Sequence, residues 1–429
     1  MKSVEHIVLR DVDIQNIGQL EVYEKQGGYQ ALRQILTQHT PEEIIDLVKR
    51  SGLRGRGGAG FPTGAKWGFV PKDTRPQYLI VNADESEPGT FKDRQIIERN
   101  PHQMLEGSII SAYAIGANVA YIYIRGEFAY GARVLGRAIA EAHQRGYLGQ
   151  RIFGTDYALD IYLHRGAGAY ICGEETALLE SLEGRLGMPR LKPPFPAVVG
   201  LYNKPTVINN VETLANIPLI VERGPEWFRQ YGTEKSPGTK VFSLCGHVNG
   251  AGNYELPLGT PLRELIYEYG GGIPGHRAVK AVVPGGASAP ILSADHLDVG
   301  MDFESLAQAG SMLGSGGVIV IDETACVVRA AWKMIRFFKH ESCGKCTPCR
   351  EGTYWLSKVL EDIERGGARE ADISLAGNIA SQMVGRCFCP LGEAAVSPVL
   401  SSLKYFQAEY EEHLRLGRCP YPNGVPASV

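Results

Sequence analysis

The sequence predicts a multidomain α/β protein. Strand and helix patterns alternate from about residue 76 to 235, and this alternation predicts a parallel sheet with helices on both faces. Short strands then dominate up to residue 330, and the chain is helical after that. We therefore expect a lead-in with a glycine-rich loop over 1–75, an α/β domain over 76–235, a small α+β domain over 236–330 and a helical bundle over 331–429. A length of 429 residues agrees with several domains.

The composition is that of an ordinary globular protein, with 44% apolar and 21% charged residues. A net charge of −3 without a basic stripe argues against a nucleic-acid partner. The nine cysteines cluster in motifs and no secretory segment begins at Met1–Glu5, so we expect a reducing compartment. The uncharged stretch 107–124 is interpreted as a buried helix, a turn at 116–118 and a buried strand, without membrane insertion.

The lead-in contains a helix start followed by a glycine-rich loop. Thr40, Pro41 and Glu43 have the spacing of a capping box, and the helix should end near Gly52. The loop over 55–67 matches G-x-G-x-x-G, but a helix precedes it, so it is not the dinucleotide fingerprint. Its backbone amides suit an anion, and Lys66 adds positive charge. A flexible linker is the alternative, which the loop's aromatic residues disfavour: Phe61, Trp67 and Phe69.

The α/β segment has expected strands at 78–81, 119–125 and 160–163, and expected helices at 102–115, 129–145 and 174–183. Ligands of such sheets bind beyond the carboxyl ends of the strands. Two loops are expected there, 82–89 and 165–175. They are the first candidates for a ligand site.

Carboxylates and amides in these loops suggest a nucleotide-like ligand, or two. The acidic residues within 84–87 would repel a phosphate but suit ribose or ribityl hydroxyls. Glu174 and Glu175 repeat this pattern. Residues 209–213 offer amides and a hydroxyl to a heterocycle, and the proline-rich segment 190–195 holds a cation and an aromatic ring. The alternatives are, in turn, a solvated acidic turn, a helix cap, an ordinary capped turn and a connecting loop.

After residue 236, the expected strands are 240–245, 279–283 and 318–321, with one short helix near 261–269. The helical segment that follows has an apolar stripe formed by Leu356, Val359, Leu360 and Ile363. Ile379 and Met383 begin another stripe. Residues from 418 onward are rich in proline and glycine and are expected to be extended.

Four cysteines of the helical segment have the spacing of an iron–sulfur site. Cys343, Cys346 and Cys349 form C-x₂-C-x₂-C, and Cys389 precedes a proline further along the chain. A [4Fe–4S] cluster requires four thiolates in such an arrangement. Structural zinc is the alternative, although zinc sites usually combine two ligand pairs, and His340 lies outside the triplet spacing.

Together these segments resemble the flavoprotein subunit of NADH–quinone oxidoreductase, known as the F subunit of respiratory complex I. The matching segments are 52–69, 82–94, 166–184, 190–213, 341–352 and 388–392. The resemblance implies a Rossmann-like α/β domain that binds FMN and NADH, a ubiquitin-like β-grasp domain, and a helical bundle with one [4Fe–4S] cluster. It also implies that NADH gives a hydride to FMN, from which single electrons pass to the cluster.

Site residues follow from the resemblance by motif. Those for FMN are Gly55, Gly57, Lys66, Asn82, Asp84, Glu85, Ser86, Gly173, Glu174, Asn209, Asn210 and Thr213. Those for NADH are Phe61, Phe69, Glu87, Glu175, Lys192 and Phe195, of which Glu87 and Glu175 are expected to act in catalysis. The cluster ligands are Cys343, Cys346, Cys349 and Cys389. Cys387 competes with Cys389 as fourth ligand, Cys172, Cys245 and Cys326 are expected in the core, and Cys419 stays unassigned.

The resemblance further implies partners and a location. The partners would be a thioredoxin-like [2Fe–2S] subunit, a large subunit with several iron–sulfur clusters and the remainder of complex I. The chain would lie on the cytoplasmic side of the inner membrane and be held there through the complex, without a signal peptide or transmembrane helix of its own. The alternative is the diaphorase subunit of an NAD-linked hydrogenase or formate dehydrogenase, whose flavoprotein chains are usually longer.

Overall fold

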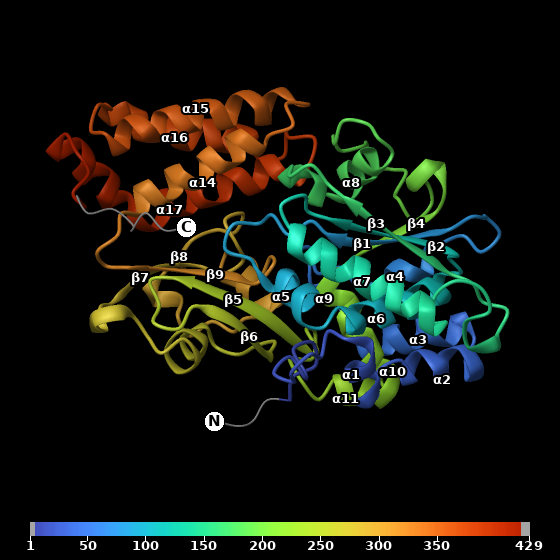
Figure 1. The fold of residues 1–429 in the computed structure, drawn as a ribbon. Coiled ribbons are helices and arrows are strands. Elements are labelled where there is room, and N and C mark those ends of the chain that lie inside the picture. Colours follow the sequence, from blue (N-terminus) through green and yellow to red (C-terminus); the bar gives the residue numbers. More distant parts are fainter. Residues whose placement is uncertain (1–4, 422–429) are drawn as a thin grey trace. The chain divides into compact units, whose positions relative to one another are not determined.

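The computed structural model describes residues 5–421, which form two compact units (Figure 1). The first unit contains the chain up to Ser86, Phe91–Phe242 and Asn253–Gly259. The second contains Glu87–Thr90, Ser243–Gly252 and the chain from Thr260 onward. The expectation of no secretory start at Met1–Glu5 falls almost wholly outside the described residues, as does the expected extended tail beyond residue 421.

A four-stranded parallel sheet forms the centre of the first unit, with strand order β3-β2-β1-β4. The strands are β1 (Tyr78–Ala83), β2 (Val119–Ile124), β3 (Asp160–Arg165) and β4 (Thr206–Asn210). Leu79, Ile80 and Val81 are fully buried, as is typical of a strand covered on both faces. The three predicted strands and their parallel pairing are confirmed, whereas β4 was not predicted.

Helices surround this sheet, and α6 (Pro101–Ile115) is buried on almost every side. A helix that is apolar all round belongs in a protein core, so the interpretation of 107–124 as a core helix and strand is confirmed. The other long helix is α7 (Ala129–Arg145), as predicted. The remaining helices are α1 (Leu20–Lys25), α2 (Gln30–Gln38), α3 (Pro41–Ser51), α4 (Thr63–Gly68), α5 (Lys92–Arg99), α8 (Glu175–Leu182), α9 (Val211–Ala215), α10 (Ile217–Arg223) and α11 (Pro225–Phe228).

Helix α3 has the predicted capping box. The Thr40 hydroxyl accepts a hydrogen bond from the Glu43 amide at 3.4 Å, and the Glu43 carboxylate accepts one from the Thr40 amide at 2.9 Å. Gly52 ends the helix in the left-handed conformation, with φ of 70°. The glycine-rich loop therefore starts directly after a well-defined helix end.

A second, mixed sheet has the strand order β6-β5-β9-β7-β8. Strands β5 (Thr239–Gly246) and β9 (Gly317–Asp322) pair in parallel, and β7 (Val279–Val283) pairs antiparallel with both β9 and β8 (Leu292–Ser293). The three predicted strands are confirmed, while β8 and β6 (Gly252–Pro257) were not predicted. The expected short helix is α12 (Leu262–Glu264) with the π-turn Leu265–Tyr269, and α13 (Phe303–Gln308) follows later.

Four helices follow in the second unit: α14 (Val327–Glu341), α15 (Thr347–Glu364), α16 (Glu370–Met383) and α17 (Pro390–Leu416). Helix α14 packs against α15 and α17, and α16 packs against the same two helices (Figure 1). Of the predicted stripe on α15, Leu356, Leu360 and Ile363 are fully buried, whereas Val359 is half-buried. Among residues 5–421, no helix has both the length and the apolarity needed to span a membrane.

Candidate functional site

The carboxyl ends of β1 and β4 bring three of the predicted loops together. These strands are neighbours, with Asn82 opposite Asn210 in the register. The Asn82 side-chain amide donates to the carbonyl oxygen of Gly173 at 2.9 Å, which holds the short 3₁₀ turn Tyr170–Gly173 at this edge. The loop after β1, the turn before α8 and the end of β4 therefore line one edge, where ligands of parallel sheets bind.

The glycine-rich loop lies against the same edge. A Cβ on Gly57 would be only 2.9 Å from the Asn210 Cβ, so a larger residue would push the loop away. The amide of Arg56 donates to the Thr213 hydroxyl at 2.9 Å. The loop closes where the Gly55 amide donates to the Phe61 carbonyl at 2.9 Å. The close approach of Gly57 to Asn210 explains the need for glycine at this position. These contacts exclude the flexible linker that was the alternative for this segment.

Two lysines and two glutamates form an ion-pair network beside this edge. Lys66 in α4 contacts the Glu175 carboxylate at 3.2 Å and donates to the Ile208 carbonyl at 2.8 Å. Lys192 contacts Glu174 at 3.0 Å and Glu175 at 3.3 Å. Burial alone would raise the pKa of Glu175, but the two lysines outweigh it and lower this pKa. Glu175 is therefore held as a carboxylate.

Glu174 is a helix cap, which was the alternative to a ligand-binding role for this residue. It is the N-cap residue of α8, and its carboxylate accepts hydrogen bonds from the amides of Thr176 and Ala177, both at 2.9 Å. Asn210 likewise caps α9, accepting from the Glu212 amide at 3.0 Å. Both residues have further contacts at the sheet edge, so capping does not remove them from the candidate site.

The residues of the acidic loop after β1 contact different parts of the protein. Glu85 is buried, and its carboxylate accepts hydrogen bonds from the amides of Asp93 and Arg94 at 2.8 and 3.0 Å, at the start of α5. Burial, reinforced by Asp93, raises the pKa of Glu85 to about 7. The Ser86 hydroxyl donates to Asp84 at 3.2 Å. Glu87 belongs to the second unit, where its carboxylate accepts from the Ser288 amide at 2.7 Å.

Three phenylalanine rings predicted for NADH are exposed in the first unit. Phe61 and Phe69 are 50% and 58% exposed, with ring centroids 6.1 Å apart, and Phe195 is 58% exposed. Trp67 differs, because it is buried and its indole N–H donates to the Asn209 side chain at 2.9 Å. Trp67 therefore fixes Asn209 at the end of β4, while the three phenylalanines remain available for stacking with a planar ligand.

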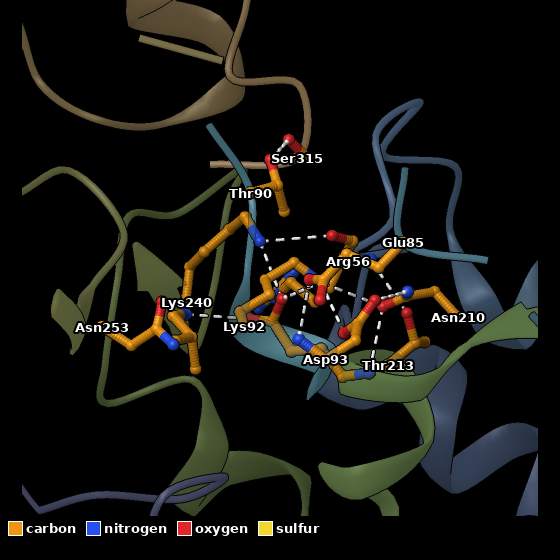
Figure 2. Close-up of polar contacts among 12 residues, drawn as sticks. Arg56, Glu85, Thr90, Lys92, Asp93, Asn210, Thr213, Lys240, Asn253 and Ser315 are labelled. Carbon is orange, nitrogen blue, oxygen red and sulfur yellow. Dashed lines mark hydrogen bonds and ion pairs between the residues drawn. The ribbon is translucent and has the colours of Figure 1, made fainter. Parts of the chain in front are cut away.

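A buried ionic cluster behind this edge was not predicted as a unit. Lys92 contacts Asp93 at 2.7 Å and Glu212 at 2.9 Å, and Lys240 contacts the same Glu212 oxygen at 2.8 Å. The Asn210 amide donates to Asp93 at 2.6 Å, so the cluster also orients a candidate ligand residue (Figure 2). Arg56 is fully buried beside it and donates to the carbonyls of Thr239, Arg54 and Pro237.

The pKa values in this cluster follow burial and pairing. Burial alone would lower the pKa of Lys92, but Asp93 and Glu212 reverse this and raise it. For Lys240 burial dominates, despite Glu212, and lowers the pKa to about 7. A sequence signal exists for Glu212 and Lys240, which are charged residues next to apolar runs, and such residues can mark buried ion pairs. Lys92 lies among other charged residues, so its burial had no such signal.

The four cysteines predicted as cluster ligands lie at neighbouring helix ends in the second unit. Cys343 follows α14, Cys346 is the N-cap residue of α15, Cys349 is in its first turn, and Cys389 is the N-cap residue of α17. The Phe388 amide donates to the Cys346 sulfur at 3.4 Å, which joins the two segments. Helix N-termini stabilise thiolates, so this donor set suits an iron–sulfur cluster.

Cys387 lies in the same cysteine group. Burial, together with the nearby thiols of Cys349, Cys346 and Cys389, raises the pKa of Cys387 to about 12. A Cβ on Gly392 would fall 2.2 Å from the Cys387 sulfur and 3.4 Å from the Cys349 Cβ. Glycine at position 392 thus leaves room for the sulfur atoms.

Comparison with known proteins gives the family. A model described as the Nuo51 FMN-binding domain matches residues 48–219, and one described as the NADH-ubiquinone oxidoreductase-F iron-sulfur binding region matches residues 329–413. The chain is 57% identical over 419 residues to an NADH-quinone oxidoreductase F subunit (number 2) of Rhizobium meliloti (strain 1021), covering 97% of this chain and 99% of that protein. This chain belongs to the family of NADH-quinone oxidoreductase F subunits. The predicted family is confirmed, as are its FMN and [4Fe–4S] cofactors.

A further relative and a solved structure agree. The NADH-quinone oxidoreductase F subunit of Streptomyces coelicolor (strain ATCC BAA-471 / A3(2) / M145) is 54% identical, over 94% of this chain and 89% of its own length. A solved structure of an NAD+-reducing [NiFe]-hydrogenase in the air-oxidized state is similar, with a TM-score of 0.82 and 36% identity over 96% of this chain and 67% of that chain. An SLBB domain model matches residues 241–292.

Proposed function

We infer that this chain is the NADH-oxidising flavoprotein subunit of an NADH–quinone oxidoreductase. The observation that carries this conclusion is the 57% identity to an F subunit of such an enzyme, which extends over nearly the whole of both chains. When bound, FMN supplies the chemistry: it accepts a hydride from NADH and releases electrons one at a time to the [4Fe–4S] cluster. The chain's own residues bind and orient these groups, so no catalytic base is required.

We assign FMN to the edge of the four-stranded sheet. The glycine-rich loop would bring backbone amides close to the phosphate, because Gly55 and Gly57 lack a Cβ that would hold it away. Side-chain amides and hydroxyls would bind the polar edges of the flavin. The proposed FMN residues are Gly55, Gly57, Lys66, Asn82, Asp84, Glu85, Ser86, Gly173, Glu174, Asn209, Asn210 and Thr213.

Two of these assignments carry structural constraints. The carboxylate of Glu85 already accepts two amides of α5, so Glu85 would act by shaping the loop. Glu174 would act in part through its cap on α8. Neither constraint conflicts with a position beside the flavin. They make both residues positioning groups.

We assign NADH to Phe61, Phe69, Glu87, Glu175, Lys192 and Phe195. The three exposed rings support this assignment, since a stacked adenine would cover apolar surface worth about 25 cal/mol per Å². Glu175, ionised beside its lysines, would accept hydrogen bonds from the adenosine ribose and repel a 2′-phosphate. Glu87 would line the path of the nicotinamide, and its carboxylate accepts a hydrogen bond from the Ser288 amide.

The cluster would be held by Cys343, Cys346, Cys349 and Cys389. Cys389 is preferred over Cys387 because it is the N-cap residue of α17, where the helix end stabilises a thiolate. Cys387 would then be a close neighbour of the cluster without binding it. Its thiol already contacts the Met383 carbonyl at 3.4 Å.

The finer organisation is proposed on the same basis. We propose a lead-in over 1–75, a Rossmann-like FMN and NADH domain over 76–235, a β-grasp domain over 236–330 and a helical bundle with the cluster over 331–429. The SLBB match and the mixed sheet support the third domain, and the mutual packing of α14–α17 supports the fourth. The partners would be a thioredoxin-like [2Fe–2S] subunit and a large multi-cluster subunit, within a complex that holds the chain at the cytoplasmic side of the membrane.

A diaphorase subunit of an NAD-linked hydrogenase is the second candidate. The similarity to the [NiFe]-hydrogenase chain favours it, but that chain is matched over only 67% of its length, against 99% for the Rhizobium meliloti protein. Isolation of the native assembly distinguishes the two. Complex I subunits should co-purify with this chain, whereas a nickel-containing subunit would support the hydrogenase alternative.

The activity is tested with ferricyanide as electron acceptor. The purified chain with FMN should reduce ferricyanide when NADH is added, and the same chain without flavin should not. As a control, a substitution of the exposed Glu21 in α1 should leave the rate of ferricyanide reduction by the flavin-loaded chain unchanged. Flavin-loaded protein that binds NADH but transfers no electrons would contradict the proposed function.

A further inference from the structure

Four potential metal ligands meet in the second unit, apart from the cysteines assigned to the cluster. They are Cys326, Glu364, His413 and Cys419, and one ligand atom from each lies within 4.8 Å of the others. Cys326 and His413 are fully buried, and Glu364 is 5% exposed. Cys326 precedes α14 and the cluster triplet follows it, so a helix about 22 Å long separates the two groups. From this set we propose a second metal site, which binds a structural zinc ion.

The distances between these atoms are close to those around a tetrahedral zinc ion. The Cys326 sulfur is 3.4 Å from both the His413 Nε2 and the Glu364 Oε2, and those two atoms are 3.1 Å apart. Zinc bond lengths of about 2.0–2.3 Å place neighbouring ligands of a tetrahedron about 3.3–3.8 Å apart. Shifts of a few tenths of an ångström would therefore admit the ion.

The hydrogen bond of His413 orients this ring as a ligand. Its Nδ1 lies 2.6 Å from the Glu409 carbonyl oxygen, which can only accept, so Nδ1 carries the proton. In the neutral ring Nε2 then has a lone pair, and this atom faces Cys326 and Glu364. A backbone carbonyl on the far nitrogen is the usual support of a metal-bound histidine.

The surrounding charges also favour a cation. Two thiolates, one carboxylate and a divalent ion sum to −1, and the Arg329 guanidinium, 2.5 Å from the other Glu364 oxygen, neutralises this. The Arg329 amide donates to the Cys326 sulfur at 3.2 Å, which stabilises a thiolate. Glu364 ends α15 and His413 lies in the last turn of α17, and the carboxyl ends of helices attract cations.

The donor set selects the metal. Two sulfurs, one imidazole and one carboxylate suit zinc, whereas magnesium and calcium prefer oxygen ligands alone. The ion would tie Cys419, just after the end of α17, to the start of α14 and the end of α15. Close packing supports this clamp, since a Cβ on Gly366 would fall 2.0 Å from the Gly417 carbonyl carbon. The site thereby gives Cys419 a role.

Zinc content of the full chain tests the proposal. Anaerobic protein from zinc-supplemented medium, with its iron–sulfur cluster loaded, should contain about one zinc ion per chain after dialysis against EDTA. X-ray absorption at the zinc edge should show two sulfur and two nitrogen or oxygen neighbours. Cys419→Ser should lower zinc at least tenfold while FMN and iron stay constant, whereas Cys346→Ser should lose iron and keep zinc.

The following results would overturn the proposal. The first is wild-type chain that contains no zinc under these conditions, and the second is zinc that survives Cys419→Ser, because the ion would then lie elsewhere. The third is a disulfide between Cys326 and Cys419, detected by mass spectrometry of unreduced protein, which would replace the metal as the explanation of this cluster. If Cys419→Ser fails to retain FMN, the zinc-edge spectrum of the wild-type chain decides alone, and a spectrum with sulfur neighbours only rejects the site.

Discussion

The polar groups at the edge of the four-stranded sheet are paired with one another, whereas burial raises the pKa of several thiols in the second unit, among them Cys326 and Cys349. At the sheet edge, Lys66 and Lys192 balance the charges of Glu174 and Glu175. Among the helices, burial and neighbouring sulfurs raise the pKa of Cys349, and burial raises that of Cys326. The first region is therefore organised before a ligand arrives, while the second gains most from a metal that converts thiols to thiolates.

The largest effect is expected at the cysteine triplet. Cys346→Ser removes one ligand of a four-ligand cluster, so iron should fall to near zero. FMN content should stay unchanged, because the proposed flavin residues belong to the first unit. Iron, sulfide and flavin analysis of one anaerobic sample measures both. Joint loss of iron and flavin would show that the two regions do not form independently.

The choice between Cys389 and Cys387 sharpens this result. Cys389→Ser should remove most of the iron, whereas Cys387→Ser should keep it, because only Cys389 is assigned as a ligand. The second variant also removes a thiol whose pKa is raised to about 12. Electron paramagnetic resonance of the dithionite-reduced protein reports the cluster. The reverse outcome would make Cys387 the fourth ligand.

The buried ionic cluster provides the matching test of the first region. Glu212→Gln leaves Lys92 and Lys240 without their shared carboxylate, and breaking such a buried pair should lower the free energy of unfolding by about 3–5 kcal/mol. The exposed pair of Arg50 with Glu226 is the control, and Glu226→Gln should leave stability nearly unchanged. Urea denaturation of the two variants measures the difference. Equal stabilities would mean that the region is not held by these charges.

A smaller effect is expected for nucleotide choice. Glu175→Gln should raise the ratio of kcat/KM for NADPH to that for NADH by about tenfold, equal to about 1.4 kcal/mol. The effect should not be larger, because Lys66 and Lys192 already offset part of the glutamate charge. Steady-state rates with both nucleotides measure it. An unchanged ratio would remove Glu175 from nucleotide selection.

The last expected effect is a dependence of stability on pH. Glu85 has a folded pKa of about 7, above the ordinary value of 4.5, so the folded state binds its proton more tightly. Its contribution is complete below about pH 4.5 and is lost as pH rises through 7. The free energy of unfolding of flavin-free chain should therefore decline across this range, and less so in Glu85→Gln. Parallel slopes for both chains would contradict the raised pKa.

Local patterns allowed much of the fold to be predicted. Thr40 and Glu43 located the start of α3, and runs of buried apolar residues located β1, β2 and β3. Strand β4 was not predicted because only Val207 and Ile208 form its apolar run, and the asparagines after them favour a turn. The order of the strands was not predicted either, since nothing in a single strand specifies its neighbour.

The candidate sites likewise differ in how well the sequence predicts them, according to whether their residues are close together along the chain. Cys343, Cys346 and Cys349 are close in sequence, so their spacing alone indicates a metal site. Cys326, Glu364, His413 and Cys419 are spread over more than ninety residues and meet only after α14, α15 and α17 pack. The buried position of Arg56 was also missed, because a guanidinium inside a glycine-rich loop suggests exposure.

The central claim is that one chain holds FMN on its parallel sheet and a [4Fe–4S] cluster between its C-terminal helices. Anaerobic purification followed by flavin, iron and sulfide analysis, then addition of NADH, tests this most directly. We expect about one FMN, about four iron and about four sulfide per chain, with loss of the oxidised flavin absorbance when NADH is added. Colourless protein that binds no flavin even when FMN is supplied would contradict the account.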